Sequence, residues 1–337
     1  MPLSPTVRTW LLRIGSFLLA GILLYFALRN ADLEAVGAAL RDADYRWLLP
    51  VLFITLLSHW LRAMRWGIML DALPGQDRRT SRLVGFLSIM IGYMANYAGP
   101  RVGELVRSGN MAAHERIPFS SMVGTVVAER VLDVLTLALA LLTLPLLYGR
   151  RLWTLSDTLF EPLSGVSTAT WVIILAVLVV GGSVAVWILF FRVGSESTSR
   201  ISGLVGTFRQ GLLSVVRTGR GSTILLLTAA IWTCYATMAY VPFAMLHQTA
   251  AYGISPIDAW GLMLLGSLGV VIPAPGGIGT FHLITIQSLA LLYGMPESDA
   301  ATYALLTHTG QMILYVLVGF IAIIYLGGVK RVPASKR

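Results

Sequence analysis

Long apolar stretches dominate this chain of 337 residues, and their length constrains its fold more than any other feature. A helix needs about 20 apolar residues to cross the roughly 30 Å hydrocarbon core of a membrane. Charged residues make up only 12% of the chain, against about 25% in soluble domains. The sequence therefore predicts an all-α polytopic membrane protein, with one integral membrane domain over residues 1–337. Six stretches are expected to span the membrane, at about 10–28, 46–66, 119–147, 170–191, 222–246 and 300–327. The first lacks the cleavage site of a signal peptide, so we expect it to be retained.

Two further apolar stretches, 83–98 and 258–293, are interrupted by glycine and proline. The first breaks at AGPRVG (98–103) and the second at VVIPAPGGIGTFH (270–282). Loop charge indicates how these stretches run, because basic loops remain in the cytoplasm. All strongly basic segments fall on one side of the membrane only if both interrupted stretches turn back without crossing. The connecting segments 29–46 and 148–168 contain similar numbers of basic and acidic residues. This predicts two re-entrant broken hairpins, a multi-pass protein of the cytoplasmic (inner) membrane, and both termini in the cytoplasm.

The predicted order of elements is the same in the two halves, about 1–168 and 169–337. Each half reads span, span, re-entrant stretch, span, and the halves begin at opposite faces. This is the layout of an inverted repeat, in which interrupted segments at matching places indicate a transport site.

The remaining composition narrows the classes of function. The net charge of +9 is nearly all arginine next to apolar runs, which favours anionic lipid headgroups over nucleic acid as the partner. A single cysteine, Cys234, excludes an intrachain disulfide. We find no metal-ligand cluster and no nucleotide-binding motif, so we expect no metal, no cofactor and no direct use of ATP. The sequence leaves open whether the chain forms a homo-oligomer.

The first break carries the strongest candidate site. Arg101, Glu104 and Arg107 recur every three residues and follow Asn96 closely, so we expect them on one face of a short helix over 100–115. A helix N-terminus together with guanidinium groups suits a phosphate. The alternative is an exposed cytoplasmic turn that carries the positive-inside signal.

The second break contains glycines that allow another group to approach the backbone closely, and it contains no cluster of charged residues. Gly276 and Gly277 allow tight turning near a ligand or a neighbouring helix. Packing through small residues explains them equally well. His282 follows, and it is either a hydrogen-bonded structural histidine or a proton carrier.

Charges also occur inside two predicted spans. Glu129, Arg130 and Asp133 have spacings that place them on one side of a helix, where intramembrane charges face the protein interior and are usually functional. A structural Arg130–Asp133 pair is the alternative. Arg62 and Arg65 near the end of the second span are candidates for ligand binding, and reaching cytoplasmic headgroups explains them as well.

Four motifs in order resemble a known family: RAMRW (62–66), NYAGPRVGELVR (96–107), AERVLD (128–133) and PAPGGIGTF (273–281). They are similar to the membrane domain of bacterial lysylphosphatidylglycerol synthases and to related stand-alone flippase-like proteins. The resemblance covers most of the chain. Its motif positions here are Arg62, Arg65, Asn96, Pro100, Arg101, Gly103, Glu104, Arg107, Glu129, Arg130, Asp133, Pro275, Gly276, Gly277 and Gly279. The chain departs from the family where His282 replaces an expected acidic residue.

The resemblance implies movement of a phospholipid or a polyprenyl-linked lipid across the membrane. Our leading expectation is a non-enzymatic transporter of an anionic lipid, whose headgroup binds in a central cavity between the two re-entrant hairpins. An ion-coupled carrier of a small soluble anion is the second hypothesis, and a membrane enzyme acting on lipid phosphates is the third. Which lipid moves, in which direction and with what energy source are not readable from the sequence.

Overall fold

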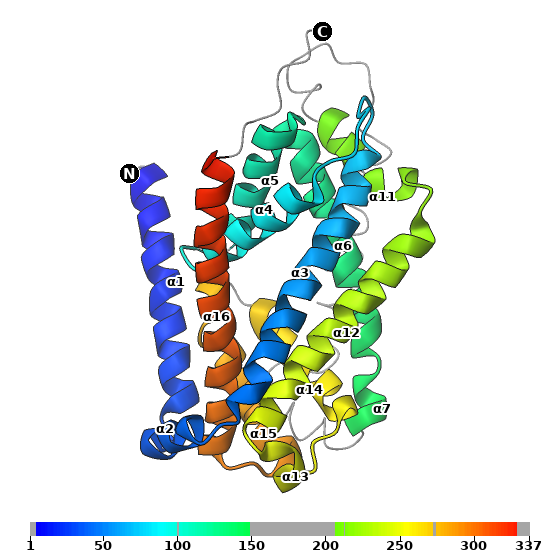
Figure 1. Cartoon of the computed structure of the whole chain (residues 1–337). Helices are drawn as coiled ribbons and strands as arrows, with labels where there is room; N and C mark the ends of the chain where they lie inside the picture. The colour runs from blue at the N-terminus through cyan, green and yellow to red at the C-terminus, as the bar shows by residue number, and fades with distance from the viewer. Residues whose placement is uncertain (1–4, 100, 149–205, 212, 272–273, 329–337) are drawn as a thin grey trace, which may run out of the picture.

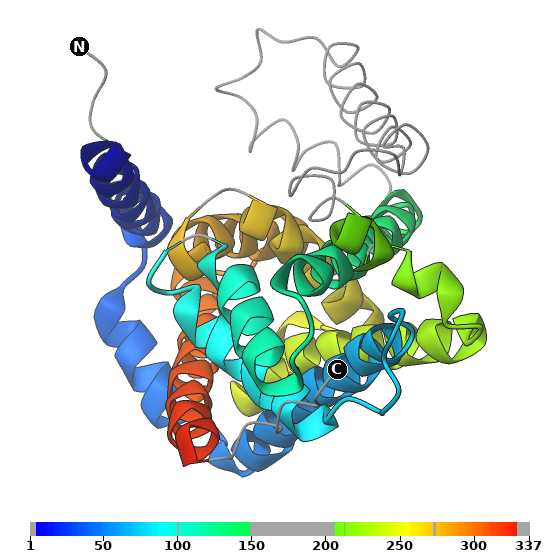
Figure 2. The same ribbon diagram turned by 90° about the horizontal axis from the view of Figure 1, so that it is seen from above.

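The computed structural model describes residues 5–99, 101–148, 206–211, 213–271 and 274–328, and all regular elements in these ranges are helical (Figure 1). The predicted all-α class is therefore confirmed for the described part of the chain. Viewed from above, α1 stands at the edge of the helix bundle (Figure 2). The long helices are α1 (Pro5–Leu28), α3 (Leu48–Asp71), α6 (Phe119–Leu141), α12 (Gly221–Met245) and α16 (Glu297–Gly328).

The described residues contain five helical segments that are long and apolar enough to cross a membrane. These segments are Tyr45–Asp71, Phe119–Tyr148, Gly221–Met245, Pro275–Tyr293 and Glu297–Gly328. A sixth is reached if α1 and α2 (Leu33–Arg41), which meet at an 85° bend, form one span. The chain is thus a multi-pass membrane protein. The predicted span 170–191 and the division between the halves near residue 168 lie outside the described residues.

The segment Pro275–Tyr293 differs from the sequence prediction, which treated it as half of a broken stretch. It reaches 19 residues only because the short turn η3 (Pro275–Gly277) precedes α15 (Thr280–Tyr293). Gly276, inside η3, has φ 60°, so the helix is interrupted there. At 1.5 Å per residue, α15 alone is about 21 Å long, which is short of a hydrocarbon core of roughly 30 Å.

Helix α2 and the turn η1 (Tyr45–Trp47) lie in segment 29–46, for which the apolar pattern predicts no helix. Asp32 caps α2, and its Oδ1 accepts hydrogen bonds from the backbone N–H groups of Glu34 (2.9 Å) and Ala35 (3.2 Å). An aspartate N-cap followed by a glutamate in the first turn is a helix-start signal. That signal was present in the sequence.

Helices α3 and α12 pack together and run in opposite directions. At one end the Asp44 N–H donates to the Met245 carbonyl oxygen (2.8 Å), and further along Arg65 Nη1 donates to Thr228 Oγ1 (2.9 Å). Since the residue numbers rise in one helix as they fall in the other, the pairing is antiparallel. A short helix, α7 (Leu144–Tyr148), continues α6, and α11 (Ser214–Arg217) precedes α12.

The first broken stretch folds back on itself. Helices α4 (Arg82–Ala95) and α5 (Val102–Glu115) form an antiparallel pair, here called the first hairpin. Asn110 Nδ2 donates to Ser88 Oγ (2.7 Å), and Gly92 lies against Gly103 nearer the break. A Cβ atom added to Gly103 would lie 2.1 Å from the Gly92 carbonyl oxygen. The two backbones can approach this closely only because both positions are glycine.

The second broken stretch forms a matching pair. Helices α14 (Pro256–Val271) and α15 are antiparallel, and we call them the second hairpin. At its open end, near α13 (Gln248–Tyr252), the Tyr293 hydroxyl donates to Asp258 Oδ1 (2.8 Å). Gly269 lies against Thr280 at the closed end. The two hairpins enter the bundle from opposite ends (Figure 1).

The tips of the two hairpins touch. The Gly276 N–H donates to the Asn96 carbonyl oxygen (3.1 Å), and the Tyr97 ring covers Gly276. A Cβ at Gly276 would lie 2.4 Å from the Tyr97 ring carbons. Segments about 180 residues apart in the chain thus meet between the two ends of the long helices (Figure 1).

Candidate functional site

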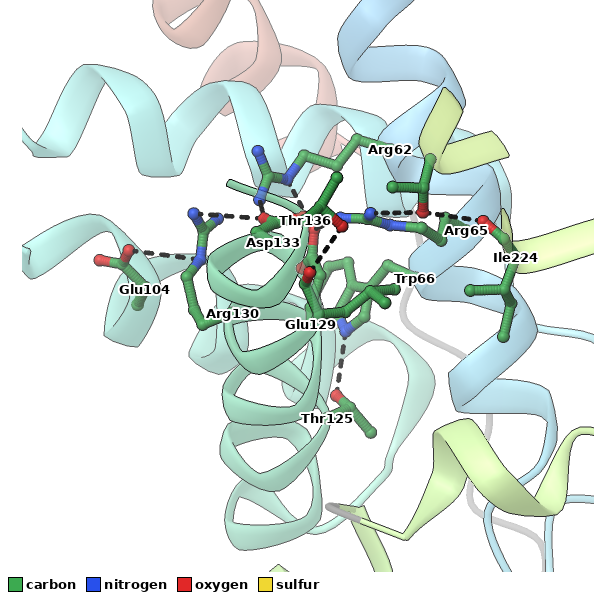
Figure 3. A network of polar contacts seen from close by, with 12 residues as sticks. Arg62, Arg65, Trp66, Glu104, Thr125, Glu129, Arg130, Asp133, Thr136 and Ile224 are labelled. Atoms are coloured by element: carbon green, nitrogen blue, oxygen red, sulfur yellow. Dashed lines mark hydrogen bonds and ion pairs between the residues drawn. The ribbon is translucent and has the colours of Figure 1, made fainter. Parts of the chain in front are cut away.

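A buried ion-pair network joins α3, α5, α6 and α12, and the carboxylates of Glu129 and Asp133 lie between its arginines (Figure 3). Arg62 Nε donates to Glu129 Oε1 (2.6 Å), and its Nη2 pairs with the Asp133 carboxylate. The side chain of Glu129 is fully buried, and that of Arg62 is only 4% exposed. Glu129 lies about 15 Å from the start of α6 at a rise of 1.5 Å per residue. Such buried charges deep in an apolar helix are costly unless they are paired.

Arg65 extends the same network. Its Nη2 donates to Asp133 Oδ1 (2.5 Å) and more weakly to Glu129 Oε1 (3.3 Å). The Arg65 side chain has no exposed surface. The interpretation that Arg62 and Arg65 reach out to headgroups is therefore wrong, because both guanidinium groups point into the protein and pair with carboxylates of α6.

Arg107 brings the first hairpin into the network. Its Nη2 lies 2.8 Å from Glu129 Oε2, but the two atoms are not aligned for a hydrogen bond. Its guanidinium also lies 5.1 Å from the centre of the Trp66 ring, where cation–π attraction operates. The indole N–H of Trp66 in turn donates to Thr125 Oγ1 (2.9 Å). Charge and stacking together fix Arg107 beside α6.

The accessible edge of the network is formed by Arg130 and Glu104, whose side chains are 40% and 30% exposed. Arg130 Nε lies 3.8 Å from Glu104 Oε1, and Arg130 Nη1 lies 3.6 Å from Asp133 Oδ2. Both distances exceed hydrogen-bond length. Arg130 Nε and Glu104 Oε2 have no hydrogen-bond partner among the described residues. Arg65 Nε and Arg107 Nη2 also lack a hydrogen-bond partner there, but both side chains are buried, so Arg130 is the most accessible arginine of this network. The predicted proximity of Arg130 to Asp133 is confirmed.

Hydroxyl groups that the sequence motifs do not predict complete the network. Arg62 Nη1 donates to the hydroxyls of Tyr93 on α4 (3.0 Å) and Tyr235 on α12 (3.1 Å), and Thr228 accepts from Arg65. Tyrosine and threonine inside apolar spans are weak signals on their own. Which of these hydroxyl groups contact the arginines depends on which helices pack against α3, and the sequence does not show this packing.

The remaining residues of the first break have other roles than expected. Asn96 Oδ1 accepts from the Gly103 N–H (2.8 Å), so Asn96 caps the start of α5. Arg101 precedes α5 with a left-handed backbone (φ 60°) and an exposed side chain, while Arg107 is buried. The prediction that Arg101, Glu104 and Arg107 share one helix face is therefore wrong for Arg101. Pro100 lies outside the described residues.

At the tip of the second hairpin, Gly276 and Gly277 both have positive φ (60° and 77°), as expected for tight turning. His308 Nε2 on α16 lies 3.0 Å from the Gly276 carbonyl oxygen. His282 is 2% exposed, and its ring centre lies 4.8 Å from that of His308. His282 is therefore one of a pair.

The predicted site residues thus fall into two groups. The network contains Arg62, Arg65, Glu104, Arg107, Glu129, Arg130 and Asp133, and the hairpin tips contain Asn96, Arg101, Gly276, Gly277 and His282. In the network, four arginines face three carboxylates, which leaves one positive charge in excess. Within the described residues, no three His, Cys, Asp or Glu side chains are grouped as a metal site.

Among characterised proteins, the chain is 25% identical over 353 aligned residues to a protein named Glycosyltransferase AglD from Haloferax volcanii. The match covers 95% of this chain and 55% of that protein, so the chain spans about half the length of this relative. No solved structure matches. The family model described as the lysylphosphatidylglycerol synthase TM region matches residues 13–319. The chain therefore belongs to the lysylphosphatidylglycerol synthase transmembrane-region family.

Proposed function

We propose that this protein carries an anionic lipid, either a phospholipid or a polyprenyl-phosphate-linked lipid, across the cytoplasmic membrane. The observation that carries the proposal is the ion-pair network, which is buried except at Arg130 and Glu104 and in which four arginines meet three carboxylates. A structural purpose needs balanced charge, because an unpaired buried charge is strongly destabilising. The excess cation, with Arg130 at the accessible edge, instead suits an anion that binds and leaves.

Two exposed arginines are the proposed contacts for the lipid phosphate. Arg130 holds only loose ion pairs, and Arg101 forms no ion pair with a described residue. A guanidinium group can donate two parallel hydrogen bonds to a phosphate. Arg62, Arg65 and Arg107 hold Glu129 and Asp133 in place behind them and set the charge of the site.

The hairpins support a transport role through their lengths and positions. Helices α4 and α5 contain 14 residues each, and α14 contains 16, so each arm is about 21–24 Å long. Arms of this length suit re-entrant hairpins, since a hydrocarbon core of roughly 30 Å needs longer helices. The first hairpin lies between α3 and α6 in the chain, and the second between α12 and α16, as an inverted repeat requires. We propose a central binding cavity where the hairpins meet.

The name of the relative raises the question of whether this chain is an enzyme. Glycosyl transfer is what that protein is named for, and this chain covers only part of it. We propose transport without catalysis for this chain, with a lipid as its partner. The small soluble anion remains the competing substrate, because the same arginines would bind it.

The test is leaflet exchange in liposomes that carry NBD-labelled phosphatidylglycerol and purified protein. Dithionite bleaches only the outer leaflet, so exchange appears as loss of the protected signal. We expect exchange above that of protein-free liposomes, and we expect Arg130→Gln to slow it by roughly tenfold, the cost of losing one charge-assisted contact. Arg101→Gln should act in the same direction.

Arg79→Gln is the matched control, because Arg79 is exposed in the loop before α4 and lies outside both groups. It should leave exchange unchanged. Wild-type exchange equal to that of empty liposomes, tested also with a labelled polyprenyl phosphate, would refute lipid transport. Uptake of labelled inorganic phosphate in the same vesicles would favour the small-anion carrier, and release of phosphate from the lipid would favour an enzyme.

A further inference from the structure

Two histidines at the tip of the second hairpin take no part in the network. His282 lies on α15 and His308 on α16, with their ring centres 4.8 Å apart. His282 is 2% exposed, and its Nε2 has no hydrogen-bond partner among the described residues. Such a pair inside a membrane protein is costly and marks a functional position.

The backbone contacts fix the tautomer of each neutral ring. His308 Nε2 faces the Gly276 carbonyl oxygen, which only accepts, so this nitrogen carries the proton. His282 Nδ1 accepts from the Gly279 N–H (3.4 Å), so the proton of His282 is on Nε2. His308 Nδ1 is therefore the one lone pair of the two rings that can take a proton without breaking these contacts.

Two neighbours would stabilise a charge on His308. Its hydrogen bond to Gly276 would become charge-assisted, and such bonds are roughly twice as strong as neutral ones. The His308 ring also stacks on Phe281, with centres 5.4 Å apart and planes 28° apart, which allows cation–π attraction. A second proton on His282 would place two like charges within about 5 Å and would break the Gly279 contact. The pair thus has room for one proton.

The described ionisable groups on the packed helices form neither an ion pair nor a hydrogen bond with either ring. Asp258 on α14 is bonded to Tyr293 at the opposite end of the second hairpin, and Tyr315 on α16 to His59. The other groups are Tyr25 on α1, Glu34 and Arg41 on α2, Arg82, Tyr93, Tyr97, Arg101, Glu104, Arg107, His114 and Glu115 on the first hairpin, Cys234, Tyr235 and Tyr240 on α12, and Glu297, Asp299, Tyr303 and Tyr325 on α16. The proton would therefore have no carboxylate counter-ion.

We propose that His282 and His308 form a proton-binding site, with the proton on Nδ1 of His308, and that the bound proton tightens the contact between the second hairpin and α16. Gly276 is held on two sides, by His308 through its carbonyl oxygen and by Asn96 through its N–H. Protonation strengthens the first of these contacts. Acid conditions thus hold Gly276, and with it the contact between the hairpin tips, more firmly than alkaline conditions, under which neutral His308 still donates to Gly276. The use of this proton to drive transport rests on the proposed function, whereas proton binding does not.

The test measures the separation of the hairpin tips by electron–electron resonance between two spin labels. Ala98→Cys in the first hairpin and Leu268→Cys near the tip of the second place both labels at exposed positions, in a Cys234→Ser background. We expect a narrow distance distribution at about pH 4 and a broader or longer one at about pH 8, around the ordinary range of histidine titration. A distribution that stays the same across this range would overturn the proposal.

His308→Gln keeps a neutral N–H donor for Gly276 and cannot bind the proton. It should give the alkaline distribution at every pH. His114→Gln is the matched control, since His114 is bonded to backbone oxygens of α5 and α16 and lies away from the tips; it should respond to pH as the wild type does. A His308→Gln protein that still responds to pH like the wild type would refute the site.

Nitrogen-15 NMR of histidine-labelled wild-type protein provides a test that needs no folded His308 variant. The signals of His59, His114 and His247 are first identified by replacing each of these three histidines with glutamine. Of the two remaining rings, one should gain a second proton on acidification, while the other keeps the neutral tautomer with its proton on Nε2. Titration of both rings, or of neither, would contradict the proposal. Neither measurement depends on lipid exchange, so the proton site and the proposed transport can fail separately.

Discussion

The buried carboxylate of Glu129 is the counter-charge for several arginines. Its oxygens lie next to Arg62, Arg65 and Arg107, which come from two different helices, and its side chain is fully buried. Glu129→Gln would leave three buried guanidinium groups short of a counter-charge. Breaking a buried ion pair from one side costs about 3–5 kcal/mol. We therefore expect a large loss of stability, measured as a fall in the thermal unfolding midpoint in detergent.

Glu34→Gln is the control for this prediction, because Glu34 is an exposed glutamate on α2. Its unfolding midpoint should stay close to that of the wild type, as most surface substitutions change stability by less than about 0.5 kcal/mol. A Glu129→Gln protein that is as stable as the wild type would show that the arginines have other counter-charges.

The sequence predicted the charged members of this network but not all of their partners. Spacing alone places Glu129, Arg130 and Asp133 on one side of a helix, and the structure agrees. Spacing cannot show that Arg62 and Arg65 turn inward, because an arginine near the end of a span reaches a headgroup equally well. The choice depends on α6 packing beside α3, which is a long-range contact.

Among the helices, the first hairpin depends on a close backbone contact. A Cβ at Gly103 would lie 2.1 Å from the Gly92 carbonyl oxygen and 2.6 Å from Asn96 Oδ1. Gly103→Ala therefore forces α4 and α5 apart and disturbs the cap. We expect a loss of about 1–3 kcal/mol, the usual cost of overpacking, measured as the change in unfolding midpoint.

Gly109→Ala lies on the same helix and is the comparison for Gly103→Ala. The nearest atom to its added Cβ would be 3.9 Å away, which is an ordinary contact. Since alanine favours helix by up to about 1 kcal/mol over glycine, this variant should be as stable as the wild type or more so. Equal losses in both variants would argue against a specific contact between α4 and α5.

At this scale the sequence predicts most element boundaries well. The predicted spans 119–147, 222–246 and 300–327 agree closely with the described helices, because long apolar runs are strong signals. The end of α3 at Asp71 was missed by several residues, since Arg62 and Arg65 were interpreted as the end of the apolar segment. The predicted span 46–66 is therefore shorter than α3, because its arginines are buried in the protein and do not mark the membrane surface.

For the whole molecule, the arrangement of loops allows a test of orientation. The loop between α3 and α4, which contains Arg79, and the loop between α5 and α6, which contains Arg116, lie at one end of the bundle, and α2 lies at the other (Figure 1). The positive-inside rule then predicts that the first of these ends faces the cytoplasm. In a Cys234→Ser background, Arg79→Cys should resist an impermeant thiol reagent in intact cells, while Ala35→Cys should react.

Both cysteines replace exposed residues, so access to the reagent and not burial decides the outcome. Permeabilised cells should label both variants and serve as the control. Labelling of Arg79→Cys alone in intact cells would reverse the predicted orientation. It would leave the packing of the helices untouched, because the direction of insertion is set by the loops.

The contact between the hairpin tips runs from the main-chain nitrogen of Gly276 to the main-chain oxygen of Asn96. No exchange of side chains can delete this bond as long as the backbone keeps its path, apart from proline at position 276, which would remove the donor. Related chains can therefore keep the same junction while sharing few polar residues there. A comparison of side chains alone would not reveal what joins the two parts of the molecule.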